Sequence, residues 1–545
     1  MTGRMRQLAS DTLVYGISSV VARFVNYLLV PLHTDRFDPD QYVVVGLVYA
    51  AIALLNVLFT AGFESAYVRF SKSREGVPVL FATSQTFLLL LATGLCGLLV
   101  FVRPAALPLL ELGDDPAGIF WMMLGILWFD TLVVAPFAEF RMARRTWRFA
   151  ALKLFHVAVN VGLNLALLLG AGMGVEAVFV SNLAASALTA FLAWGSTWSL
   201  LKGGRFDLVV LRKAWAFGWP FIPAGLGHAV NELLDRFFLA GMDPADAARL
   251  YGEGTEAAAV AGIYNGVYKM AVFMLLLVQM FRMAWQPFFM RHADEPNAPT
   301  LFERAFNGFN LVAGAVFLLV GLFLHEIASL TVPLLGVPLL GEAYRSGLSV
   351  VPILLAAYWF HGWYIHFSAG VYINGNSSAF AWITLAGALI TVISNWLLVP
   401  LFGMAGAALT TLFSYLTMAL ILLAVSRRSW PVPYRVIPSL TFVGALFAGV
   451  WFEPRLAELL VGLGWLESAG DWDWKLAYAG GWLLLLAAGA LWWKQMGRSE
   501  GERAGDGGVA GSEGVDESEE EWEDGEEDWE DGESDTNEPG PRDGR

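Results

Sequence analysis

Charged residues are scarce in this chain: they make up 15% of its 545 residues, where soluble domains carry roughly 25%. The shortage is uneven, because 20 of the 49 acidic residues but only 3 of the 34 basic residues lie from Ser499 onward. The net charge of −15 therefore belongs to an acidic C-terminal tail, and the preceding segment is close to neutral. This distribution excludes a uniformly acidic soluble protein.

Cysteine and catalytic motifs are also scarce. The single cysteine, Cys96, lies in an apolar run and cannot form an intramolecular disulfide. The sequence has no Gly-rich phosphate loop with lysine, no Gly-x-Ser-x-Gly segment and no zinc-type His/Cys cluster. The pair Asp471 and Asp473 resembles an acidic metal motif, but it stands alone in a short loop. We therefore expect no enzyme, no cofactor and no metal site.

Long apolar runs are abundant, since hydrophobic residues make up 57% of the chain. A membrane-spanning helix needs about 20 mostly apolar residues. Fourteen such runs follow one another, which predicts an all-α membrane protein with fourteen transmembrane helices. They lie near residues 11–31, 42–67, 80–102, 117–140, 149–170, 175–201, 214–241, 259–282, 302–324, 346–371, 378–400, 403–426, 435–452 and 474–496.

The basic residues orient these helices. Loops on the cytoplasmic side of a membrane carry an excess of Lys and Arg. With the N-terminus inside, the inner loops hold 21 basic residues and the outer loops hold 6. A missed or extra span would disturb this ratio along the rest of the chain. We therefore predict a multi-pass protein of the bacterial inner membrane with both termini in the cytoplasm.

One pair of segments suggests an internal repeat. Asn164 and Asn395 each stand eight residues before a Gly-Met pair, at the turn between two adjacent spans. The spans concerned are five–six and eleven–twelve. An offset of six spans predicts two six-helix lobes of the same orientation, related by a pseudo-twofold axis, as in some secondary transporters. Leu-rich helices also resemble one another by chance, but the independent span count favours a repeat.

These patterns divide the chain into four parts. The last two helices are additional to the two lobes, and the acidic tail is expected to be disordered and cytoplasmic. The predicted parts are residues 1–213 for the first lobe, 214–430 for the second, 431–498 for spans thirteen and fourteen, and 499–545 for the tail.

Span seven carries the densest group of ionisable residues. A charge at the centre of a bilayer costs roughly 2.5–3.5 kcal/mol on insertion scales. His228, Glu232 and Asp235 share one helical face, and Arg236 lies four residues after Glu232. Glu232 and Asp235 are candidates for coupling to H⁺ or Na⁺. Alternatively, the charges form an ion pair that locks this span to a neighbour.

Span five carries a second polar stripe. Lys153, His156, Asn160 and Asn164 recur at helical spacing on one face. Such a face predicts a cationic, hydrogen-bonding wall for an anionic substrate. The alternatives are that the asparagines join helices by hydrogen bonds, and that Lys153 extends to the inner surface.

Arg23 stands midway along span one, far from both ends. The guanidinium group recognises phosphate through a rigid fork of donors. Together with Lys153, Arg23 predicts a site for a pyrophosphate, with Arg236 and Lys269 as further substrate-binding candidates. The alternative is that Arg23 pairs with an acid such as Asp130.

Several segments resemble one known family across roughly residues 11–495. The chain is similar there to bacterial polysaccharide biosynthesis proteins, the O-antigen-type flippases of the multidrug/oligosaccharidyl-lipid/polysaccharide (MOP) exporter superfamily. The resemblance is densest in spans one, two, seven and eight. It is carried by Val14–Thr34, Gly62–Phe70, Asn231–Arg236, Gly262–Lys269 and Gln279–Phe289.

The resemblance implies a two-lobed bundle with a central cationic cavity and alternating access. The implied substrate is an undecaprenyl-pyrophosphate-linked oligosaccharide that moves from the cytoplasmic to the outer leaflet. The implied partners are this lipid-linked oligosaccharide, membrane lipids and other polysaccharide-assembly proteins, with no nucleic acid. A lipid II flippase and a multidrug or metabolite antiporter are the alternatives, and the excess of buried base disfavours the antiporter. The insert at 243–256 and the acidic tail depart from the family pattern.

Overall fold

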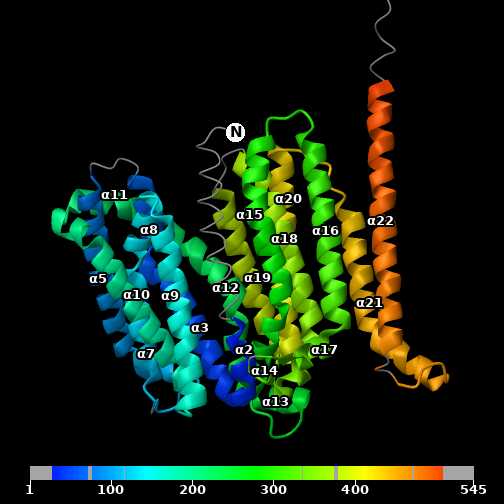
Figure 1. Cartoon of the computed structure of the whole chain (residues 1–545), viewed down its shortest axis with the longest axis horizontal. Coiled ribbons are helices and arrows are strands. Elements are labelled where there is room, and N and C mark those ends of the chain that lie inside the picture. Colours follow the sequence, from blue (N-terminus) through cyan, green and yellow to red (C-terminus); the bar gives the residue numbers. More distant parts are fainter. Residues whose placement is uncertain are drawn as a thin grey trace, which may run out of the picture. The chain divides into compact units, whose positions relative to one another are not determined.

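The computed structural model describes residues 27–71, 76–115, 117–333, 335–373, 378–468, 470 and 472–506. Arg23 and most of the predicted span 11–31 lie outside this part of the chain. The chain separates into two units, residues 1–486 and 487–545. The first unit contains nearly all of the described residues, and its architecture is helical (Figure 1).

The first helices differ in length, and several consecutive ones together form a segment long enough to span a membrane. In chain order they are α2 (Leu29–Arg36), α3 (Pro39–Thr60), α4 (Phe63–Phe70), α5 (Val77–Phe101), α6 (Arg103–Leu109), α7 (Ile119–Leu132), α8 (Val134–Met142), α9 (Thr146–Leu165), η1 (Ala166–Gly170) and α10 (Glu176–Gly203).

The remaining elements include one two-residue antiparallel β-pair between helices. They are α11 (Leu208–Gly218), α12 (Phe221–Ala240), α13 (Pro244–Tyr251), α14 (Ala257–Tyr268), η2 (Lys269–Ala271), α15 (Val272–His292), α16 (Ala298–Leu322), α17 (Leu324–Ser329), β1 (Thr331–Val332), β2 (Val337–Pro338), η3 (Glu342–Val350), α18 (Val351–Ile373), α19 (Ser378–Phe402), α20 (Met404–Ser429), α21 (Val436–Gly462) and α22 (Trp472–Asp506).

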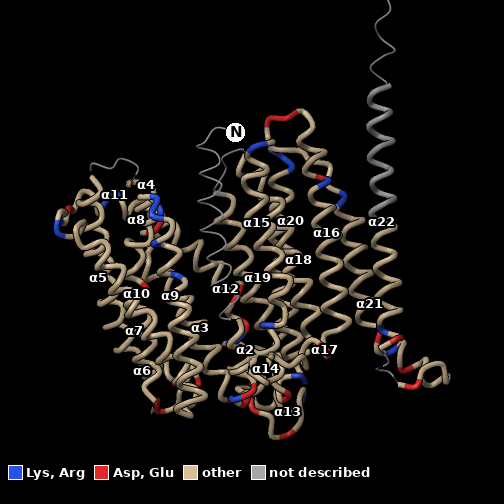
Figure 2. Tube along the Cα trace, in the orientation of Figure 1, with Lys and Arg blue, Asp and Glu red and all other residues tan. Residues whose placement is uncertain are grey.

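Within the described residues, 11 helical segments are long and apolar enough to cross a membrane, and each coincides with a predicted run. This number of long apolar helices is typical of a multi-pass membrane protein. Figure 2 shows Lys, Arg, Asp and Glu mainly towards the ends of the helices, which leaves few charged residues in their middles. The total of fourteen spans stays a prediction.

The predicted span 214–241 is interrupted in the structure. Helix α11 ends at Gly218 and helix α12 begins at Phe221. Pro220 and Pro223 have no amide hydrogen, so they cannot continue the hydrogen bonds of a preceding helix. Helix α12 is also less apolar than the 11 segments, because it carries Glu232, Asp235 and Arg236 among its 20 residues.

Helix α3 connects two groups of helices. On one side α10 packs against both α7 and α9, and on the other α20 packs against both α18 and α19, with α12 against α19. Helix α3 packs along both α12 and α14. The approach to α14 is close, because a Cβ atom on Gly262 would meet the Pro39 carbonyl oxygen at 1.7 Å. Small residues permit such contacts between membrane helices.

The two segments that suggested a repeat share their local structure. Asn164 and Asn395 are both fully buried, and each donates its side-chain amide to the carbonyl four residues earlier, at 2.9 and 3.0 Å. Gly172 and Gly403 both have positive φ, 62° and 55°, at the turn into the next helix. The likeness supports the repeat, and the arrangement in two symmetric lobes stays a prediction.

Candidate functional site

A polar cavity of about 390 Å³ lies among α2, α3, α9 and α10, with η2 contributing one residue. We call it the amide cavity, because three asparagines line it. Among the described residues that line it there is no Asp or Glu, and Lys269 is the only Lys or Arg. Its polar members are Tyr27, His33, Tyr42, Tyr49, Asn160, Asn164, Asn182 and Lys269.

Hydrogen bonds hold the asparagines of the amide cavity in place. The Asn164 amide donates to the carbonyl and side-chain oxygens of Asn160, at 2.9 and 3.2 Å. Its own oxygen therefore faces His33, whose Nε2 donates at 3.1 Å. On the opposite wall, the Asn182 amide donates to the Tyr49 hydroxyl at 2.8 Å. The cavity thus presents fixed groups that both donate and accept hydrogen bonds.

A second cavity, of about 460 Å³, lies among α3, α4, α7, α8, α9 and α10. We call it the charged cavity, because acids and bases line it together. Arg141 of α8 forms an ion pair with Glu64 of α4. Opposite charges therefore offset one another in this wall. Its ionisable members are Glu64, Asp130, Arg141, Lys153 and His156.

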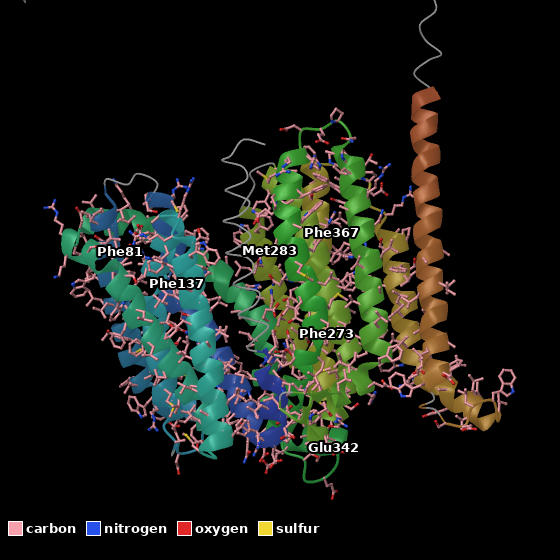
Figure 3. All side chains as sticks on the ribbon, in the orientation of Figure 1. Phe81, Phe137, Phe273, Met283, Glu342 and Phe367 are labelled. Atoms are coloured by element: carbon pink, nitrogen blue, oxygen red, sulfur yellow. The ribbon has the colours of Figure 1, made fainter. Side chains whose placement is uncertain are left out.

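Helix α9 positions the two predicted residues of the charged cavity. The Lys153 ammonium lies 4.9 Å from the ring centre of Phe137, which is labelled on α8 in Figure 3. This is within the range of a cation–π contact. His156 Nδ1 lies 3.4 Å from the Thr189 hydroxyl of α10. Both side chains line the cavity, where His156 is half-buried and Lys153 stays exposed.

The charges of α12 form a third, buried group. Asp235 accepts a hydrogen bond from the Tyr264 hydroxyl at 2.7 Å and lies 3.4 Å from Arg236 Nη1. The Arg236 guanidinium donates to the Glu232 carbonyl at 2.7 Å and lies 4.5 Å from the ring centre of Tyr268. Each charge therefore has a partner close by.

Glu232 completes this group. Its carboxylate lies 3.2 Å from the Tyr358 hydroxyl and 3.5 Å from the Tyr268 hydroxyl. The two phenols also contact each other at 2.7 Å. These bonds tie α12 to α14 and α18. This arrangement matches the alternative interpretation, in which the charges of span seven hold that span to its neighbours. The assignment of Glu232 and Asp235 to ion coupling stays a prediction.

The structure therefore distributes the predicted site residues over three places. Lys153 lies with His156 in the charged cavity, and Asn160 lies with Lys269 in the amide cavity. Arg236 lies with the predicted coupling carboxylates on α12.

Sequence reasoning missed several residues of both cavities. They are His33, Tyr49 and Asn182 of the amide cavity, and Glu64 and Arg141 of the charged cavity. A signal existed on α10, where polar residues recur at helical spacing through Asn182, Ser186 and Thr189. His33 stands close to the end of a predicted span, where polar residues are ordinary.

The chain shares its fold, a bundle of membrane-length helices with cavities between them, with solved structures of transporters. The lipid II flippase MurJ in an inward closed conformation has a TM-score of 0.66 at 11% identity, covering 89% of this chain and 99% of that one. An inward-facing multidrug resistance MATE family transporter of the MOP superfamily has a TM-score of 0.59 at 14% identity, covering 74% of this chain and 93% of that one. An outward-facing MATE family transporter has a TM-score of 0.52 at 16% identity, covering 77% of this chain and 94% of that one.

The family follows from the sequence itself. The family model described as polysaccharide biosynthesis protein matches residues 8–292. The match spans more than half of the chain, so the chain belongs to the polysaccharide biosynthesis protein family. A search of curated proteins finds no match. The solved structures are those of transporters and of a flippase, and the similarity of this chain to them is one of fold.

Proposed function

We propose that the chain moves an undecaprenyl-pyrophosphate-linked oligosaccharide from the cytoplasmic to the outer leaflet by alternating access. The observation that carries the proposal is the amide cavity, in which the Lys269 ammonium stands among amides, phenols and an imidazole without a carboxylate in the described wall. An ammonium attracts a phosphate, and the neutral groups match the hydroxyls of a sugar.

The charged cavity supplies the entry to this site. It lies nearer the end of α9 that carries Arg145 and Arg148, which is the predicted cytoplasmic side. Lys153 and His156 there meet the pyrophosphate before it reaches Lys269, and Arg23 of the predicted span one is a further proposed contact. The sugars then occupy the amide cavity, while the polyprenyl tail stays in the bilayer.

The proposal includes the finer features of the predicted architecture. These are fourteen spans in two lobes of six with two extra helices, in the inner membrane with both termini cytoplasmic. Coupling to H⁺ or Na⁺ through Glu232 or Asp235 would drive the cycle. Both carboxylates lie at the contact of α12 with α14 and α18, where a change of charge would alter helix packing.

Two other substrates share parts of this chemistry. A multidrug antiporter that carries cations needs an acid in its site, and the described wall of the amide cavity has none. Lipid II combines a pyrophosphate with sugars, so a lipid II flippase satisfies the same requirement. Both are therefore assayed beside the proposed substrate.

The test is complementation of bacterial strains that lack their own O-antigen flippase, each strain with a different saccharide. We expect restored surface polysaccharide in at least one strain, and a loss of about 10- to 100-fold for Lys269→Gln, because a charge-assisted contact is removed. Lys213→Gln, an exposed lysine of α11, is the matched control and should transport normally. Rescue only of a strain depleted of its lipid II flippase would replace the proposed substrate by lipid II.

A further inference from the structure

The amide cavity and the charged cavity lie on successive turns of the same three helices. On α3, Tyr42 and Tyr49 line the amide cavity, and Asn56 and Thr60 line the charged cavity. The step from Tyr49 to Asn56 is about 10 Å along a helix. The two cavities are therefore stacked end to end along α3.

Helices α9 and α10 show the same order. On α9, Asn160 belongs to the amide cavity and His156 to the charged cavity. On α10, Asn182 belongs to the amide cavity, and Ser186 and Thr189 belong to the charged cavity. All three helices therefore place the two cavities, or compartments, in the same order.

One hydrogen bond lies at the end of the amide cavity that is nearest the charged cavity. Tyr49 and Asn182 are the residues of α3 and α10 in the amide cavity that lie nearest the charged cavity. The Asn182 amide donates to the Tyr49 hydroxyl at 2.8 Å, which joins α3 to α10. The Tyr49 ring also lies 5.7 Å from the ring of Phe179, so packing supports its position.

Asn182 also contacts the other compartment. Its side-chain oxygen accepts a hydrogen bond at 3.3 Å from the Ser186 hydroxyl, and Ser186 lines the charged cavity. The two halves of one amide thus face opposite compartments. A group that binds Ser186 competes for the hydroxyl that donates to Asn182.

We propose that the Tyr49–Asn182 hydrogen bond is a gate between the charged cavity and the amide cavity. The proposal rests on the proposed function, because the gated cargo is the polar part of the lipid-linked saccharide. A sugar hydroxyl donates and accepts hydrogen bonds, so it replaces either partner of the bridge as it passes. Apolar molecules offer no such replacement, and the bridge selects against them.

The test clamps the gate with two introduced cysteines. Cys96 is the only native cysteine, so Cys96→Ser gives a clean background. In it, Tyr49→Cys and Asn182→Cys are joined by a bifunctional methanethiosulfonate reagent. We expect saccharide transport to stop on cross-linking and to return on reduction, while either single cysteine variant is insensitive to the reagent. Transport at an unchanged rate through the cross-linked protein would refute the gate.

A labelling experiment separates the gate from the identity of the substrate. In inside-out vesicles, Val178→Cys reports the amide cavity and Thr189→Cys reports the charged cavity, each added to the clamped protein. We expect the clamp to reduce labelling of Val178→Cys to background and to leave that of Thr189→Cys unchanged. Equal labelling of both contradicts the gate, even if no saccharide is transported.

The last comparison removes a single hydroxyl group at a time from the wall of the amide cavity. Tyr49→Phe removes only the bridging hydroxyl, and we expect faster labelling of Val178→Cys from the cytoplasmic side. Tyr42→Phe removes a hydroxyl from the same wall and leaves the bridge intact, so labelling should not change. Identical behaviour of the two variants would show that the bridge does not limit access.

Discussion

Single buried charges in this protein are held by phenols and by one another. Asp235 and Arg236 are adjacent on α12 and only 3% and 4% exposed, yet each has a partner of opposite charge or a hydroxyl donor. Burial of an unpaired charge is costly, and a partner offsets that cost without making the pair strongly stabilising. Removing either residue alone should therefore destabilise the folded protein more than removing both together.

This asymmetry gives a prediction for the Asp235–Arg236 pair. We expect Asp235→Asn to lower the free energy of unfolding by about 3 kcal/mol, because Arg236 is left buried without a carboxylate. The double variant with Arg236→Gln should recover part of that loss. Thermal unfolding of the purified protein in detergent measures both. Strictly additive losses would show that the two side chains do not form an effective pair.

The residues of the two cavities show the limit of sequence reasoning at this scale. Lys153 and His156 were predicted on one face of span five, and the structure brings them into one cavity. Lys269 was predicted as a substrate contact in span eight, and packing brings it into one cavity with Asn160 of span five. The spacing of residues on one helix is fixed by helix geometry, whereas contacts between helices depend on packing that one sequence does not reveal.

Helices α3 and α14 approach each other closely, and Gly262 of α14 permits this contact. The Pro39 carbonyl occupies the place that a Cβ on Gly262 would need, at 1.7 Å. Backbone atoms cannot move aside as a flexible side chain can. Gly262 therefore determines how closely α3, which carries wall residues of both cavities, can lie against α14.

The prediction at this scale concerns Gly262→Ala. We expect a lower melting temperature, because α3 must move away from α14 to admit the methyl group. Gly308→Ala is the matched control, since nothing lies within 4 Å of a Cβ placed on that residue of α16. The control should be neutral or stabilising by up to about 1 kcal/mol, since alanine favours a helix. Equal melting temperatures for the two variants would contradict the close contact.

Element boundaries were predictable where apolar runs are long and uninterrupted. The exceptions have physical causes: Pro220 and Pro223 divide the predicted seventh span, and the insert after it folds as α13. There the Tyr251 hydroxyl accepts a hydrogen bond from the backbone amide of Met404 at 2.7 Å, beside the turn at Gly403. Such a contact between distant segments leaves no periodic signal in the sequence.

For the whole molecule, charge distribution and family membership point to the same class of protein. The excess of basic residues in alternate loops predicts the orientation, and the membrane-transporter fold agrees with a family of polysaccharide biosynthesis proteins. The structure adds two cavities that both lie along α3, α9 and α10. Composition predicted the membrane, but not where these cavities would lie.

The most direct test is transport in proteoliposomes that contain only this protein. We predict that a polyprenyl-pyrophosphate-linked oligosaccharide moves between leaflets at a rate well above that of empty liposomes, and that Lys269→Gln reduces the rate by about 10-fold or more. A cationic drug should not be transported. Transport of the drug together with no movement of any lipid-linked saccharide, lipid II included, would contradict the account.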